Sequence, residues 1–89
     1  MTTGITILVV ALTCDPHRQA EALRAALGLT LRGARVEVRV TGPLLTPLAQ
    51  RAADTLRSFG HSVGGHAASE PGGELADAIA RADRVEVWT

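Results

Sequence analysis

The stretch Ile5-Thr6-Ile7-Leu8-Val9-Val10-Ala11-Leu12-Thr13-Cys14-Asp15-Pro16-His17 decides the fold of this 89-residue chain. Its first part, residues 5–12, is an almost unbroken apolar run rich in β-branched side chains, which is typical of a central parallel strand covered on both faces. Asp15 is suited to cap a following helix, and Pro16 suits the first helical turn because no helical hydrogen bond needs its missing N–H. We therefore expect a buried strand, a sharp turn, and a helix that is stopped by Gly33.

The composition indicates one small domain with an aliphatic core. Hydrophobic residues make up 46% of the chain, but only Phe59 and Trp88 are aromatic. The nine basic and nine acidic side chains cancel, so the positive surplus of a nucleic-acid-binding domain is missing. We expect a single domain over residues 1–89 that does not bind nucleic acid.

Cysteine content and the N-terminal residues bear on the location of the protein. The chain has one cysteine, Cys14, which excludes an internal disulfide and fits a reducing compartment. The first residues carry no positive charge, and no signal-peptide cleavage site follows the apolar run. That run is also too short to span a membrane. A cytoplasmic protein without a membrane partner is the expectation.

Strand and helix patterns alternate along the rest of the chain. Two segments alternate polar and apolar residues, which is typical of strands with one buried face. Two further segments repeat apolar residues at spacings of three and four, as helices with one buried side do. This alternation favours a parallel sheet with right-handed crossovers. The expected strands are residues 5–12, 35–40, 61–66 and 84–88, and the expected helices are residues 16–32, 47–59 and 74–82.

The burial patterns also predict an order for the strands. A strand that is apolar on both faces belongs in the middle of a sheet, and alternating strands belong at its edges. We therefore expect the order 2-1-3-4, the flavodoxin-like arrangement, in a three-layer α/β domain with three helices. The first helix would lie on one face and the other two on the opposite face. The face with one helix would keep an uncovered half beside strands 3 and 4, where we expect a homo-oligomer to form.

With these elements in place, the sequence resembles the DsrE/DsrF-like family, also called YchN-like. The likeness spans most of the chain and implies small α/β subunits assembled as dimers, trimers or hexamers. It also implies persulfide chemistry, because the best-understood members pass sulfur between cysteines in sulfur oxidation and tRNA thiolation. The residues that carry the likeness are Ile5–Leu12, Thr13-Cys14-Asp15-Pro16, Ala22-Leu23-Arg24-Ala25-Ala26-Leu27-Gly28-Leu29, the run from Gly33 to Pro43 with Val36-Glu37-Val38 and Thr41-Gly42-Pro43, and a last strand ending in Trp88.

The chain departs from the sulfur-carrying members at one place. Those members have their cysteine in the loop after the third strand, where this chain has Gly65-His66-Ala67-Ala68. No active residue of the family therefore carries over to that loop. Cys14 lies in a different loop, after the first strand.

Cys14 is the first candidate for chemistry. A helix N-terminus makes a thiolate more stable through its N–H groups and its positive dipole end, although the carboxylate of Asp15 acts against this. In the order 2-1-3-4, His66 at the end of the third strand would neighbour Cys14. Such a Cys–His pair could carry a persulfide or act as a nucleophile. The alternative is that Cys14 is a small apolar side chain that fills space near a strand end.

Other residues near the carboxyl ends of the strands are candidates for ligand binding, because open α/β sheets bind ligands there. Asp15 is also explained as a helix cap, and His17 as a surface residue of the first turn. Cys14 and the histidines lack the close pairs of a zinc site, so we expect no metal and no cofactor. The ligand-binding candidates are Thr13, Asp15, His17, Gly42 and Gly65.

Three functions stay open on the sequence alone. The first is a DsrE-like oligomeric subunit of a sulfur relay, with Cys14 as the carrier, His66 nearby and other relay proteins as partners. The second is a non-catalytic structural, regulatory or small-ligand-binding member of the family, in which Cys14 is structural. The third is a hydrolase or transferase with Cys14 as nucleophile, for which His66 is the only visible base. A carrier or a non-catalytic subunit is favoured over a stand-alone enzyme.

Overall fold

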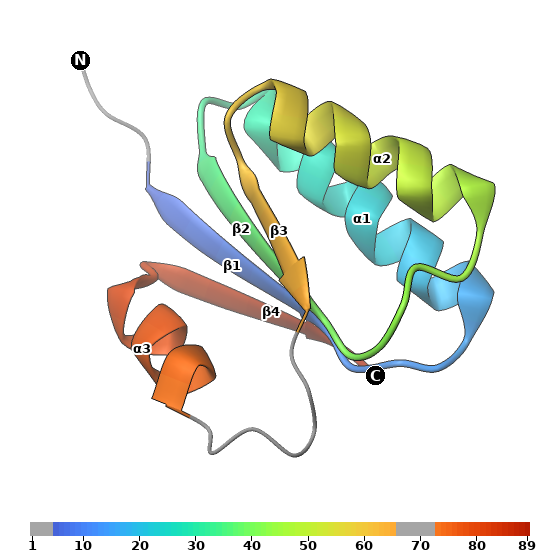
Figure 1. Ribbon diagram of the computed structural model, residues 1–89. Coiled ribbons are helices and arrows are strands. Elements are labelled where there is room, and N and C mark those ends of the chain that lie inside the picture. Colours follow the sequence, from blue (N-terminus) through green and yellow to red (C-terminus); the bar gives the residue numbers. More distant parts are fainter. Residues whose placement is uncertain (1–4, 66–72) are drawn as a thin grey trace.

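A computed structural model describes residues 5–65 and 73–89, where strands and helices alternate along the chain (Figure 1). All strand pairs are parallel, so the α/β class with a parallel sheet and three helices is confirmed. The strands are β1 (Thr6–Ala11), β2 (Arg35–Val40), β3 (Ser62–Gly65) and β4 (Arg84–Trp88), and the helices are α1 (Pro16–Thr30), α2 (Pro47–Ser58) and α3 (Gly73–Arg81).

The order of the strands differs from the prediction. The sheet runs β3-β2-β1-β4 rather than 2-1-3-4, so β2 is an interior strand and β3 is an edge. The alternating strand β2 can lie inside because its polar face is covered by ion pairs: Glu37 accepts hydrogen bonds from Arg39 and from Arg81 of α3. The order is that of the first four strands of one doubly wound arrangement, 3-2-1-4-5-6, in which the topological switch point lies between β1 and β4.

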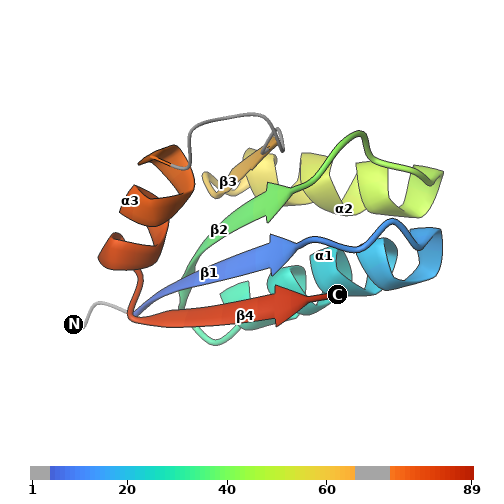
Figure 2. The same ribbon diagram turned by 90° about the horizontal axis from the view of Figure 1, so that it is seen from below.

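The helices lie in two unequal layers. Helices α1 and α2 pack side by side on one face of the sheet, and α3 lies on the other face (Figures 1 and 2). The prediction that the first helix would be alone on its face is therefore wrong. The steps from β1 to β2 and from β2 to β3 move the same way across the sheet, so right-handed crossovers place both helices on one face. The return from β3 to β4 moves the opposite way and places α3 on the other face.

Strand β1 supplies the core on both faces of the sheet. From Ile7 to Ala11 each residue is at most 4% exposed, which confirms the expectation of a central strand. The core consists of two clusters of buried hydrophobic residues, one on each face of the sheet. Ile7, Val9 and Ala11 belong to the larger cluster, on the side of α1 and α2. Leu8 and Val10 pack against Ala78 of α3 in the smaller one. The valines of β2 complete the larger cluster. This core fixes the carboxyl end of β1, from which the predicted functional turn extends.

Candidate functional site at the carboxyl edge of the sheet

The carboxyl ends of the strands meet at one edge of the sheet, from which the chain passes into α1 and α2 (Figure 2). Beyond the strand pairs, the Thr41 N–H donates to the Ala11 carbonyl oxygen at 3.1 Å. On the other side, the Leu12 N–H donates to the Trp88 carbonyl oxygen at 2.8 Å. The ends of β2, β1 and β4 are thus tied together next to the switch point, where open α/β sheets bind ligands.

Cys14 is exposed in the turn between β1 and α1. The residues on both sides of it are held in place. Thr13 is only 8% exposed, and its Oγ1 accepts a hydrogen bond from the Asp15 N–H at 3.0 Å. The thiol is therefore presented to solvent from a turn that is anchored at both ends, rather than packed within the core.

Asp15 caps α1 as the sequence predicts, and its oxygen atoms accept hydrogen bonds from the N–H groups of the first turn. Its Oδ1 accepts hydrogen bonds from the N–H groups of His17 at 2.8 Å and Arg18 at 3.4 Å. Its carbonyl oxygen accepts the Gln19 N–H at 3.0 Å, and Pro16 has no N–H to offer. The N–H groups that were expected to stabilise a Cys14 thiolate are therefore already bonded to a carboxylate. The same arrangement leaves no open cradle for a phosphate at this helix.

The predicted pair of Cys14 and His66 loses its basis in the observed strand order. The prediction needed β3 beside β1, but β2 lies between them. Gly65, the last residue of β3, pairs with Val40 of β2. His66 itself lies outside the described residues.

A buried glutamine that sequence analysis missed holds the loop after β2. Gln19 is 1% exposed, its Nε2 donates to the Pro43 carbonyl oxygen at 3.0 Å, and its Oε1 accepts the Leu45 N–H at 2.8 Å. Its position four residues before the buried Leu23 was a signal that it lies on the inner face of α1. The loop also contains Gly42, whose φ of 90° is a left-handed conformation that favours glycine.

His17 is exposed and lines a hollow of about 170 Å³ between the starts of α1 and α2, and Cys14 is not part of the lining of this hollow. Ligand cavities usually measure about 300–1,000 Å³, so this one suits only a very small group. The other lining residues are Pro16, Ala20, Thr46 and Leu48.

Arg18 and Trp88 form the border of the site beside β4. The Arg18 guanidinium carbon lies 5.5 Å from the centroid of the Trp88 ring, a cation–π distance. The Arg18 Nε also donates to the Thr89 carbonyl oxygen at 3.0 Å. Next to them is a hollow of about 330 Å³, lined by Trp88 together with Glu21, Arg24 and Ala25.

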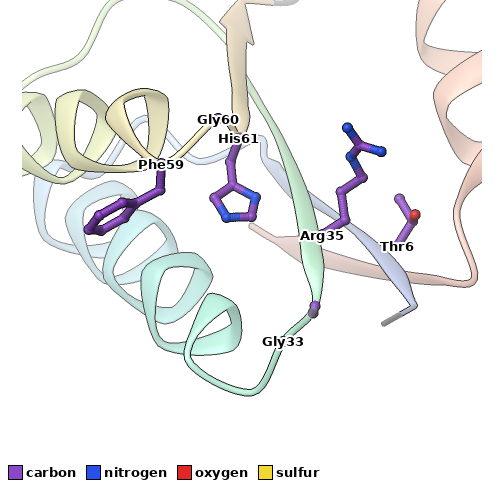
Figure 3. Close-up of a pocket in the computed structure, with 7 residues that line it drawn as sticks. Thr6, Gly33, Arg35, Phe59, Gly60 and His61 are labelled. Atoms are coloured by element: carbon purple, nitrogen blue, oxygen red, sulfur yellow. The ribbon is translucent and has the colours of Figure 1, made fainter. Parts of the chain in front are cut away.

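A larger hollow, of about 480 Å³, lies at the opposite edge of the sheet and is shown in Figure 3. Phe59 and His61 lie on one side of β2 and Arg35 on the other, so these side chains do not converge on one point. The Nδ1 atom of His61 accepts the Val36 N–H at 3.2 Å. The histidine therefore completes the hydrogen bonding of β2 and has a structural role here.

Within residues 5–65 and 73–89, no three His, Cys, Asp or Glu side chains are grouped as ligands for a metal ion, and no helix is long and apolar enough to cross a membrane. The chain shows no significant match to any family model, curated protein or solved structure. The carboxyl edge of the sheet remains the candidate functional site.

Proposed function

We propose that this chain is a DsrE-like subunit of a cytoplasmic sulfur relay, in which Cys14 carries sulfur as a persulfide. One observation carries the proposal: an exposed thiol stands on an anchored turn beside the switch point of a parallel sheet. Ligands of open α/β sheets bind at this place. The sequence resemblance to sulfur-transferring DsrE-like proteins supports the same assignment.

The chemistry of such a carrier is the exchange of one sulfur atom. The Cys14 thiolate attacks the outer sulfur of a donor persulfide, R–S–SH, and a new S–S bond forms to Sγ. The S–S bond of the donor breaks, its electron pair leaves on the inner sulfur as R–S⁻, and the proton stays on the transferred sulfur. An acceptor thiolate removes the sulfur from Cys14 by the same exchange. Neither step needs an oxidant or a reductant.

The surroundings of Cys14 suit a carrier that works with a partner. These 89 residues contain no second cysteine, so none of their other side chains can attack the persulfide as a thiolate and release its sulfur. Asp15 places a carboxylate at the helix end and occupies its N–H groups. Stabilisation of the thiolate must then come from the donor or acceptor protein that covers the turn. We expect the isolated chain to accept sulfur slowly and a relay partner to accelerate the step.

Incubation of the folded chain with a small-molecule persulfide donor tests the proposal. Intact mass spectrometry is expected to show the gain of one sulfur atom, which dithiothreitol removes, and Cys14→Ser should show no gain. Alkylation by iodoacetamide, in folded chain and in urea, is the control for access to the thiol. A thiol that is alkylated in the folded chain but accepts no sulfur would overturn the proposal.

The second candidate is a non-catalytic subunit that binds a small ligand at the same edge. The occupied N-terminus of α1 favours it, because Asp15 gives Cys14 no activation. In this case iodoacetamide still reaches the thiol, but the chain holds no transferable sulfur. The experiment above therefore separates the two functions.

A further inference from the structure

We infer that the free edge of β4 pairs antiparallel with β4 of a second copy of this chain, so that the sheet continues from one subunit into the next. This inference does not depend on the chemistry of Cys14. It follows from the difference between the two edges of the sheet and from the order of charges along β4.

The two edges of the sheet are protected differently. At β3, which has four residues, the guanidinium of Arg57 donates to the Val63 carbonyl oxygen at 3.1 Å, so a side chain of α2 bonds to the backbone of this edge. In β4, Val85 and Val87 are 37% and 55% exposed, and no side chain of the described residues is hydrogen-bonded to their peptide groups. An unprotected edge rich in β-branched residues is a template for a further strand.

The backbone of β4 presents the required groups. The Trp88 carbonyl oxygen accepts the Leu12 N–H, so it points toward β1. Peptide groups along a strand alternate in direction, which turns those of Val87 and Val85 toward the free side. Two residues of β4 therefore offer both an N–H and a carbonyl oxygen to a neighbouring strand.

The charges of β4 select a register for that neighbour. Arg84 and Glu86 lie on the same face of the strand, 3.8 Å apart at their charged atoms. A two-fold axis through Val85 would set Arg84 opposite the partner's Glu86, and Glu86 opposite the partner's Arg84. Opposite charges across an antiparallel pair are stabilising, whereas a register centred on Glu86 would set two carboxylates against each other. The favoured axis also joins the outward peptide groups of Val85 to those of its copy.

This pairing leaves the candidate site open in both subunits. Because the strands run antiparallel, the two carboxyl edges lie at opposite ends of the joined sheet. The two Cys14 turns are then far from the two-fold axis and from each other. Each subunit would act as a separate carrier.

Charge variants test the pairing. Arg84→Glu and Glu86→Arg each give β4 two charges of one sign, so we expect the dissociation constant of self-association, from sedimentation velocity, to rise about tenfold or more. Circular dichroism checks that both variants fold. When the two variants are mixed, one strand brings two carboxylates and the other two guanidinium groups, and a heterodimer is expected. The ion pair within each chain stays broken in the mixture, so it cannot explain this recovery.

A cysteine variant tests the register. In a Cys14→Ser background, Val85→Cys is expected to form a disulfide-linked dimer under oxidised glutathione, and the matched Val87→Cys is not. A wild-type chain that stays monomeric at every concentration overturns the inference, as does a mixture of charge variants without heterodimer. Cross-linking through Val87→Cys but not through Val85→Cys overturns the register.

Discussion

Replacement of Gln19 by leucine tests how the carboxyl edge of the sheet, with the candidate site, is held together. The side chain is buried in α1 and bridges the Pro43 carbonyl oxygen and the Leu45 N–H. Leucine has a similar size and removes both hydrogen bonds without leaving a large cavity. The loop after β2 then loses its attachment to α1, next to the turn that contains Cys14.

The expected loss of stability follows from those two bonds. Each hydrogen bond contributes about 0.5–1.5 kcal/mol, so the free energy of unfolding should fall by about 2 kcal/mol. Folded domains are stable by about 0.05–0.15 kcal/mol per residue, or about 4–13 kcal/mol for 89 residues. The variant should therefore remain folded but unfold at a clearly lower urea concentration.

Urea unfolding followed by circular dichroism measures this loss. The matched control is Gln50→Leu in α2, because Gln50 is exposed and its Nε2 donates only to the exposed Asp54. The control should change stability by less than about 0.5 kcal/mol. If Gln19→Leu is as stable as the wild type, or if the control loses as much, the reasoning is refuted.

Three other substitutions have defined outcomes. Burial raises the pKa of Glu37, but hydrogen bonds from Arg39 and Arg81 outweigh it and hold the pKa below 4.5. Glu37→Gln should therefore lower the free energy of unfolding by about 1–3 kcal/mol at neutral pH. The difference between wild type and variant should shrink as the pH falls below 4.5, because the Glu37 carboxylate then becomes protonated. Urea unfolding curves of the two proteins that stay equally far apart in acid would contradict this. His61→Leu leaves the Val36 N–H without its acceptor and should lower stability by about 1–2 kcal/mol, while the exposed His17→Leu should leave it unchanged. Asp15→Ala removes the N-cap of α1, so the free energy of unfolding should fall by about 0.5–2 kcal/mol and the melting temperature with it. The same change should speed alkylation of Cys14, because the helix N–H groups become free. An unchanged alkylation rate would show that Asp15 does not restrain the thiol.

The local elements were predictable from the sequence because their signals are local. The apolar run of β1 and the Asp15-Pro16 start of α1 appear in the structure as expected. The strand order was not predictable in the same way, because the position of β2 depends on a contact between distant residues. Glu37 pairs with Arg81, 44 residues later, and this pair covers the polar face of an interior strand. Once the order changes, the helix layers and the neighbours of β3 change with it.

The candidate site was predictable in its position but not in its electrostatics. The sequence placed Cys14 at the end of β1, where it lies exposed in the structure. Whether a cap leaves helix N–H groups free depends on the orientation of one carboxylate, and Asp15 turns its Oδ1 onto them. Gln19 was overlooked because a polar residue beside an apolar stripe is usually interpreted as a surface residue. In the structure, the nitrogen and the oxygen of its side-chain amide both form hydrogen bonds with the backbone of the loop after β2.

The most direct test of the central claim is transfer of sulfur through Cys14 in a single turnover. The folded chain is first persulfidated, freed of the donor and then mixed with an acceptor thiol, and intact mass spectrometry follows the sulfur atom on both. The account predicts that the sulfur leaves Cys14 and appears on the acceptor as a persulfide. A persulfide that forms on Cys14 but does not pass to the acceptor would contradict a carrier, and so would an equal gain of sulfur by the Cys14→Ser chain.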